Sequence, residues 1–290
     1  MVAVSNGVSE IQMQSQSLVR TCWRGMVIAA CTVVATTAPA AAKSLYAEPK
    51  YAAILLDAGT GEVLYSRQAD APRFPASITK VLTLYIAFEE LAKGRMAASD
   101  KIVMSRFATL QAPSKLGLKQ GATITVADAM NVIATKSAND IAVALAEHIS
   151  GSEIAFATRM TTTARRLGML SSTFVNASGL PDARQLTTAR DIATLSRAVL
   201  RDYPQYYPIF SKESVQYKGQ EINSHNHLLG VLTGVDGIKT GYTAAAGFTL
   251  AASASPSEIS RCGSHGASGM SLKYGKGSSL GSTSSTRPVR

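Results

Sequence analysis

The sequence predicts an α+β protein in which an antiparallel sheet packs against a cluster of helices. Apolar, strand-forming runs lie at the two ends of the central region, over residues 51–70 and 234–255, and helical patterns fill most of the stretch between them. This segregation is typical of an α+β fold, because a wound parallel sheet would alternate strands with helices. With 290 residues and 46% hydrophobic content, the chain is long enough to bury one sizeable core.

The first strands are expected as a hairpin, followed directly by a helix. The segment YAAILLDAGTGEVLYSRQAD holds two β-prone runs around Gly59 and Gly61. From Ile78 to about Lys93, apolar residues recur at helical spacing. The central region therefore begins with strand, turn, strand and helix.

Four more helices are expected before the chain returns to strands. Thr125 with Asp128, and Thr188 with Asp191, have the spacing of helix capping boxes. The predicted helices cover residues 126–135, 138–151, 153–167 and 188–201. The segments GVDGIKTGYT and GFTLAASAS then indicate two strands joined by a turn that contains glycine.

Charge and cysteine content exclude several classes of function. Of the net charge of +10, residues 1–42 carry +1 and residues 256–290 carry +4, which leaves +5 for the stretch between. No dense basic run with interleaved aromatic residues occurs there, which disfavours nucleic-acid binding. The cysteines are Cys22, Cys31 and Cys262. Residues 43–255 therefore offer neither a thiol nucleophile nor a thiolate metal site, and they need no disulfide.

The N-terminus has the pattern of an export signal. Arg20 and Arg24 precede the apolar run MVIAACTVVATTA, and APAAAK then supplies small residues suited to cleavage near Ala40 or Ala42. We therefore expect a leader over residues 1–42 and an exported protein in the periplasm or cell-wall space. An uncleaved leader would be the only means of membrane association.

Ser77 and Lys80, in the stretch PASITK, are the first candidates for chemistry. Residues three apart share a helix face, so the Lys80 amine can reach the Ser77 hydroxyl. A lysine desolvated by apolar neighbours loses its proton more readily and can act as a general base for the serine. By itself, however, this motif is also compatible with a solvated lysine near a helix start.

Two further motifs favour catalysis. In KSAND, Ser137 and Asn139 lie at the junction of two predicted helices, and in IKTGYT, Lys239, Thr240 and Gly241 lie on a predicted strand. Glycine there would allow a substrate backbone to approach closely. The order Ser-x-x-Lys, Ser-x-Asn, Lys-Thr-Gly is the signature of penicillin-binding proteins and serine β-lactamases.

Other kinds of site are disfavoured. A Ser-His-Asp triad would need a Gly-x-Ser-x-Gly elbow, and none accompanies the candidate histidines His148, His225 and His227. His225 and His227 are two residues apart without nearby carboxylates, a spacing more typical of loop or strand residues than of a zinc site. Ser224 and Asn226 repeat the Ser-x-Asn pattern, which we interpret as chance.

From about Tyr51 to Ser255 the sequence resembles the low-molecular-mass penicillin-binding proteins, the serine-type D-Ala-D-Ala carboxypeptidases of peptidase family S11. Besides the three motifs, the resemblance rests on the segments AAILLDAGTGEVLYSRQAD, SANDIAVALAEHISGS, the SGLP region, TTARDIA and GVDGIKTGYT. It implies the β-lactamase/penicillin-binding-protein-like transpeptidase fold. It also implies removal of the terminal D-alanine from peptidoglycan stem peptides through an acyl-enzyme, inhibition by β-lactams, and no cofactor or metal.

The resemblance implies a role for each motif residue. Ser77 would be the nucleophile, Lys80 its general base and Ser137 a proton relay toward the leaving amine. Asn139 would bind Lys80 and the substrate amide, while Lys239, Thr240 and Gly241 would receive the terminal carboxylate and the peptide backbone. The backbone N–H groups of Ser77 and Tyr242 would form the oxyanion hole.

Three alternatives remain open at this point. A class A β-lactamase would use a glutamate after Ser-x-Asn to activate the deacylating water, and no glutamate occurs between Glu153 and Glu213. A murein DD-endopeptidase would share the same motifs. A non-catalytic module that binds peptidoglycan or senses β-lactams would keep the cleft without turnover.

The end of the chain departs from the family pattern, which continues with one more interior strand. Residues 256–290 contain 16 Ser and Gly among 35 positions, and we identify no run that would form a buried strand. We therefore expect a catalytic domain over residues 43–255 that is incomplete at its C-terminus, and a tail produced by a shifted frame or altered gene end. Loss of that strand would cost stability comparable to the ~5–15 kcal/mol of a whole domain, so we expect a weakly active or inactive, aggregation-prone chain.

Overall fold

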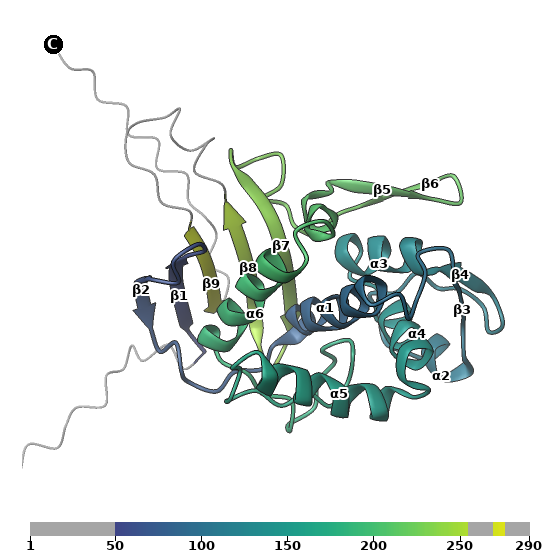
Figure 1. Ribbon diagram of the computed structural model, residues 1–290, viewed down its shortest axis with the longest axis horizontal. Coiled ribbons are helices and arrows are strands. Elements are labelled where there is room, and N and C mark those ends of the chain that lie inside the picture. Colours follow the sequence, from purple (N-terminus) through teal and green to yellow (C-terminus); the bar gives the residue numbers. More distant parts are fainter. Residues whose placement is uncertain (1–49, 255–268, 276–290) are drawn as a thin grey trace, which may run out of the picture. The chain divides into compact units, whose positions relative to one another are not determined.

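The computed structural model describes residues 50–254 and 269–275 of the chain. The expected leader and its cleavage site lie outside the described residues. Figure 1 shows the described part as a sheet on one side and a cluster of helices on the other. The predicted α+β segregation is confirmed.

A five-stranded antiparallel sheet has the order β2-β1-β9-β8-β7 (Figure 1). Its strands are β1 (Ala52–Asp57), β2 (Val63–Arg67), β7 (Val235–Thr243), β8 (Gly247–Ala254) and β9 (Gly269–Gly275). The expected N-terminal hairpin is β1 with β2, and the expected C-terminal pair is β7 with β8. Two smaller pairs that the sequence did not indicate complete the strands: β3 (Lys101–Val103) with β4 (Thr123–Thr125), and β5 (Ser214–Tyr217) with β6 (Gln220–Asn223).

The expectation that the interior strand is missing was wrong. Strand β9 lies between β1 and β8, where Leu272 is in register with Ile54 on one side and Ala251 on the other. The sequence GMSLKYG alternates apolar and polar residues between two glycines, which is the pattern of a short strand. The Ser- and Gly-rich composition of the surrounding segment hid this signal. The described scaffold therefore includes the strand that the sequence seemed to lack.

The helices form around α1, which is buried along nearly its whole length. They are α1 (Thr79–Ala92), α2 (Arg106–Thr109), α3 (Val126–Thr135), α4 (Asn139–Ser150), α5 (Glu153–Arg166) and α6 (Ala189–Asp202), with 3-10 turns η1 (Ala76–Ile78) and η2 (Tyr207–Ser211). Helix α1 contacts α3, α4, α5 and α6, and α6 also packs on β1, β8 and β9. The five longer helices were predicted, whereas the short α2 was not.

Local capping explains where several helices begin and end. The Thr125 hydroxyl accepts from the Asp128 amide at 3.0 Å, and the Thr188 hydroxyl accepts from the Asp191 amide at 3.1 Å. These bonds satisfy amides that have no partner within the helix. Gly151 ends α4 with φ of 76°, in the left-handed region that glycine adopts without strain.

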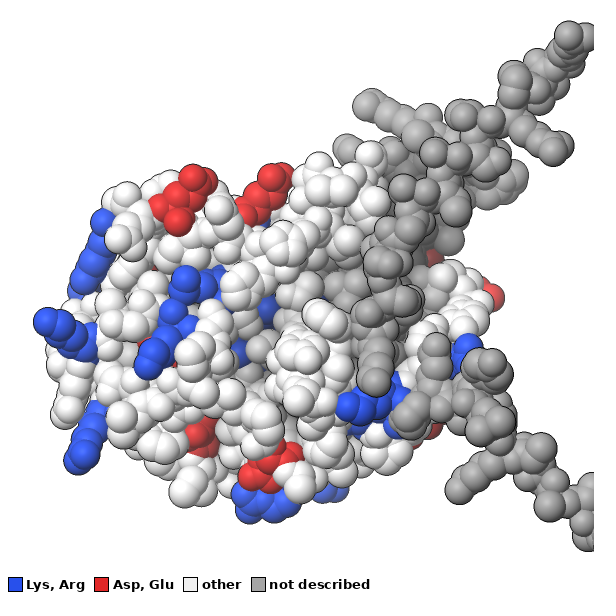
Figure 2. All heavy atoms as spheres, turned by 180° about the vertical axis from the view of Figure 1, so that it is seen from behind, with Lys and Arg blue, Asp and Glu red and all other residues white. Residues whose placement is uncertain are grey.

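On the face seen in Figure 2, the described residues form no dense basic track. Figure 2 shows basic and acidic side chains interspersed on one face, with most of the visible surface neither. Within the described ranges, no helix is long and apolar enough to cross a membrane.

Candidate active site

Ser77 is held at a point where three segments meet. It lies in η1, directly before α1, and its neighbour Ala76 has φ of 48°. A Cβ at Gly179 would lie 1.8 Å from the Ala76 carbonyl oxygen, and a Cβ at Gly241 would lie 2.8 Å from the Ser77 amide nitrogen. Only glycine permits these approaches, so the loop at Gly179 and strand β7 fix the backbone that carries the nucleophile candidate.

Lys80 lies one helical turn after Ser77 and is fully buried. Its Nζ is 3.1 Å from Ser77 Oγ, 2.7 Å from Asn139 Oδ1 and 2.5 Å from the Ser178 carbonyl oxygen. The last two atoms can only accept hydrogen bonds. A neutral amine has two N–H groups for these acceptors and one lone pair for the Ser77 hydroxyl, which is the geometry of a general base beside its nucleophile.

The electrostatics favour this neutral form. Burial lowers the pKa of Lys80 well below its usual value, the nearby positive charge of Lys239 lowers it further, and Asp140 opposes the shift. Asp140 is itself fixed, because its carboxylate accepts from the amides of Leu116 at 2.9 Å and Gly117 at 2.8 Å.

The Ser-x-Asn motif lies at the junction of α3 and α4, as predicted. Asn139 is anchored on both sides: its amide donates to the Ser114 carbonyl at 2.7 Å, and its Nδ2 donates to the Ala112 carbonyl at 2.9 Å. These bonds orient the side-chain amide so that its Oδ1 faces Lys80. Ser137 has φ of 61°, and its buried Oγ makes no hydrogen bond to the described part of the chain. A buried hydroxyl without a partner is available to a ligand.

Strand β7 carries the Lys-Thr-Gly motif at the edge of the sheet. Lys239 is 2% exposed, its Nζ donates to the Thr240 carbonyl at 3.0 Å, and burial lowers its pKa to about 7. Thr240 Oγ1 donates to the His225 carbonyl at 3.3 Å. In the described sheet β7 pairs only with β8, so its other edge has backbone groups able to pair with an extended peptide.

Tyr242 follows the motif and has two separate features. Its side chain is 60% exposed and packs on Phe248, with ring centroids 4.6 Å apart. Its backbone comes directly after Gly241, which lies against the Ser77 amide. The position of the Tyr242 N–H in an oxyanion hole remains a prediction.

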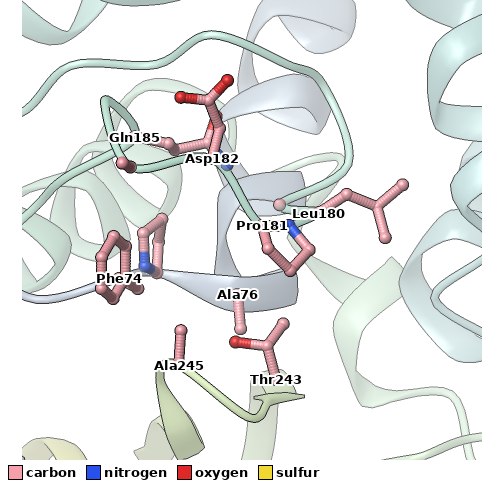
Figure 3. Close-up of a pocket in the computed structure, with 11 residues that line it drawn as sticks. Phe74, Ala76, Leu180, Pro181, Asp182, Gln185, Thr243 and Ala245 are labelled. Carbon is pink, nitrogen blue, oxygen red and sulfur yellow. The ribbon is translucent and has the colours of Figure 1, made fainter.

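A pocket of about 270 Å³ adjoins η1 on the side of the β7–β8 turn. Figure 3 shows Phe74, Ala76, Pro181, Thr243 and Ala245 around it, with the Asp182 carboxylate directed away from Ala76 and Thr243. Most of the lining is apolar. The pocket therefore offers space for an apolar group close to Ser77.

Sequence reasoning missed several residues at this site. The Ser178 carbonyl contacts Lys80, and the negative charge of Asp140 raises the pKa of Lys80. His225 contacts Thr240 through its backbone carbonyl. Asp140 directly follows Asn139, and Ser178 opens the quoted SGLP segment, so both were adjacent to recognised patterns. His225 was interpreted as part of a chance Ser-x-Asn, and only its position in space distinguishes it.

The described residues offer no cluster of metal ligands and no carboxylate in hydrogen-bond contact with Lys80. No group of His, Cys, Asp and Glu residues there is arranged to hold a metal ion. The contacts of Lys80 are a hydroxyl, an amide oxygen and a peptide carbonyl. Glu153 instead accepts from the Ala177 amide at 2.9 Å, at the base of the loop that carries Ser178.

The fold and this site place the chain in the class of proteins that carry a Ser-x-x-Lys motif beside a Lys-Thr-Gly edge strand. The family model of peptidase S11, D-alanyl-D-alanine carboxypeptidase, matches residues 36–261. The chain belongs to this family, which confirms the resemblance seen in the sequence.

Individual relatives agree with that assignment. The chain is 36% identical over 207 residues to the D-alanyl-D-alanine carboxypeptidase DacF of Bacillus subtilis, covering 70% of this chain and 53% of the relative. It is 34% identical over 213 residues to DacC of Escherichia coli, covering 71% and 53%. The chain thus spans about half the length of the curated relatives it matches.

Solved structures show the same fold. Penicillin-binding protein 5 from Haemophilus influenzae matches with a TM-score of 0.71 and 31% identity, over 77% of this chain and 64% of that one. Penicillin-binding protein D2 from Listeria monocytogenes, solved in an ampicillin-bound form, matches with a TM-score of 0.68 and 30% identity, over 78% and 90%.

Proposed function

We propose that this protein is a serine D-Ala-D-Ala carboxypeptidase that removes the terminal D-alanine from peptidoglycan stem peptides. The observation that carries the proposal is the contact of a fully buried Lys80 with Ser77 Oγ and Asn139 Oδ1. Membership of the S11 family supports the substrate class. The reaction needs no metal or organic cofactor, because the chain supplies both nucleophile and base.

Acylation uses the groups around Ser77. Neutral Lys80 takes the hydroxyl proton as Ser77 Oγ attacks the penultimate carbonyl carbon, and the resulting oxyanion is held by the N–H groups of Ser77 and Tyr242. Each such donor lowers the barrier by about 3 kcal/mol in comparable enzymes. The C–N bond then breaks, and the proton passes through Ser137 to the leaving amine. Water later hydrolyses the ester and releases the shortened peptide.

The arrangement along β7 supports an exopeptidase. Lys239 and Thr240 would receive the free carboxylate of the substrate, since a buried cation beside an edge strand favours a chain end over a chain interior. The rest of the peptide would follow β7 toward Thr243, where the apolar pocket beside Ala76 has room for part of the acyl portion. D-Ala-D-Ala-ended stem peptides have both features.

β-Lactams are expected to be inhibitors that remain attached. The structure of the Listeria relative in its ampicillin-bound form supports recognition of this class of compound. Deacylation should be slow, because none of the described contacts of Ser77 and Lys80 comes from a carboxylate that could activate water. This separates the proposal from a class A β-lactamase.

The test is covalent capture of a fluorescent penicillin by the purified protein, with the modified residue mapped by mass spectrometry. We expect one label on Ser77, none in Ser77→Ala, and release of D-alanine from a peptide ending in D-Ala-D-Ala. Many turnovers of penicillin per second would instead indicate a β-lactamase. Cleavage of a cross-linked muropeptide without release of D-alanine would indicate an endopeptidase, and binding unaffected by Ser77→Ala would indicate a non-catalytic module.

Export is part of the proposal, because peptidoglycan stem peptides are processed outside the cytoplasm. The leader expected over residues 1–42 would direct the protein to the periplasm or cell-wall space. Detection of the protein in that fraction, with an N-terminus near Lys43, is the matching measurement.

A further inference from the structure

The loop that carries the Ser178 carbonyl is held in place by side chains from two helices. Glu153, in the first turn of α5, accepts from the Ala177 amide at 2.9 Å. Thr83, one helical turn after Lys80 on α1, donates its hydroxyl to the Ala177 carbonyl at 2.7 Å. The residue directly before Ser178 is therefore bound through both of its backbone groups, and its position sets where the next carbonyl lies.

The Ser178 carbonyl in turn contacts the candidate general base. It lies 2.5 Å from Lys80 Nζ, which has Asn139 Oδ1 as a further acceptor at 2.7 Å. These two acceptors take the two N–H groups of the neutral amine, so they direct its lone pair to Ser77 Oγ. A shift of the Ser178 carbonyl would turn the amine away from the hydroxyl.

Glu153 connects this loop to the other acceptor of Lys80. Helix α4 begins at Asn139, and a two-residue turn separates the end of α4 from Glu153, where α5 begins. The two helices pack on each other and on α1 (Figure 1). Both acceptors of the Lys80 amine are thereby held by the same pair of helices, Asn139 directly and the Ser178 carbonyl through Glu153.

The surroundings of Glu153 favour a role through hydrogen bonding and not through charge. Burial raises the pKa of this carboxyl, the bond from the Ala177 amide opposes the shift, and the Glu147 carboxylate on α4 raises the pKa further. The charges that shift the pKa of Lys80 lie on β7 and α4. A carboxyl group can accept a hydrogen bond with or without its own proton. The bond to Ala177 therefore does not depend on the charge of Glu153.

We propose that Glu153 is a positioning residue for the general base Lys80. Through Ala177 it holds the Ser178 carbonyl in place, and that carbonyl directs the lone pair of the amine toward Ser77. This inference rests on the proposed function and deepens it. The reach of the side chain from α5 is what matters, so a shorter carboxylate should slow acylation and an amide of the same length should not. The affinity for the unreacted ligand should not change, because the groups expected to bind its carboxylate lie on β7.

The test is the time course of acylation by a fluorescent penicillin. It yields the acylation rate constant at saturation, the dissociation constant of the unreacted complex and the final labelled fraction. Glu153→Asp keeps the charge but shortens the side chain by one methylene. It should lower the acylation rate constant about tenfold, because a misplacement approaching 1 Å at a reacting group costs about a factor of 100. Glu153→Gln should keep a rate constant close to that of the wild type, and neither variant should change the other two quantities.

Two further variants separate positioning from a loss of stability. Asp100→Ala is the matched control, since the Asp100 carboxylate also accepts one backbone amide, that of Ala97 at 2.7 Å, in the turn before β3. It should acylate at the wild-type rate. Thr83→Val removes the other bond to Ala177 and should lower the acylation rate constant as well. Combined with Glu153→Asp it should lose less than the product of the two single losses, because both variants act through Ala177.

An unchanged acylation rate constant in Glu153→Asp or in Thr83→Val, or an equal loss in Glu153→Gln, would overturn the proposal. So would a lower labelled fraction at an unchanged rate constant, which is the result of a merely structural role. If the wild type takes up no label, the proposed function fails. The ¹³Cε resonance of Lys80, identified by its absence in Lys80→Arg, then decides the positioning role. Glu153→Asp should shift this resonance and Glu153→Gln should not, whereas equal shifts or no shift would refute the role of Glu153.

Discussion

Replacing Gly241 with alanine is expected to slow acylation of Ser77 about a hundredfold. The added Cβ would lie 2.8 Å from the Ser77 amide nitrogen and 2.6 Å from Thr249 Oγ1. Ordinary contacts begin at 3.4 Å, so η1 and β7 would have to separate by about 0.6 Å at the Ser77 amide. A misplacement approaching 1 Å at a reacting group costs about a factor of 100 in rate, and an overpacked contact costs about 1–3 kcal/mol of stability.

The assay is the second-order rate of labelling by a fluorescent penicillin, with a thermal melt of the same sample. Gly59→Ala is the control, because a Cβ there meets only Asp57 Oδ1, at 3.4 Å, and Gly59 is distant in sequence from the site motifs. We expect the control to label at the wild-type rate. Wild-type labelling by Gly241→Ala would refute the reasoning that close approach of β7 positions Ser77.

Three further substitutions test the scaffold. Burial raises the pKa of Glu153, so the folded state keeps a proton that the unfolded chain has lost, and the contribution of Glu153 to stability falls as pH rises above about 4.5. Glu153→Gln retains an acceptor for the Ala177 amide, so the melting temperature of this variant minus that of the wild type should be larger at pH 7 than at pH 4.5. A difference in melting temperature that does not change with pH would contradict this. Leu272→Pro should destabilise the protein by about 3 kcal/mol or more in urea unfolding, because proline cannot donate within an interior strand; an unchanged midpoint would show that β9 does not pair with β1 and β8. Phe88→Ala should cost about 3–5 kcal/mol, since Phe88 is fully buried against the rings of Tyr203 and Phe210, whereas Phe88→Leu should cost less than half as much, and equal losses would argue against a cavity effect.

Sequence patterns predicted the helices well because their signals are local. The Thr125 and Thr188 caps bond to amides three residues ahead, and Gly151 adopts the left-handed conformation at its own position. Each signal lies within one helical turn of the boundary it sets. The small pairs β3–β4 and β5–β6 were not predicted, because strands of three or four residues carry too little alternation to be recognised.

The last strand shows where composition misleads. Residues 269–275 alternate apolar and polar side chains, but only over a few residues inside a Ser- and Gly-rich segment. A strand this short depends on its partners, since its backbone groups are satisfied by β1, more than two hundred positions earlier, and by β8. Pairing of this kind is a property of the folded sheet and not of the segment.

The sequence by itself determined the family, the order of the motifs and the residue types that can attack a carbonyl and accept a proton. Only the tertiary structure decided which of those residues are in contact and in which direction their pKa values shift. Lys80 meets Asn139 and Ser178, which are 59 and 98 positions away, and the burial that lowers its pKa comes from elements spread along the chain. His225 likewise lies beside the site because its backbone forms hydrogen bonds with Thr135 and Thr240. Hydrogen bonding and desolvation depend on which groups are close in space, and not on their order in the sequence.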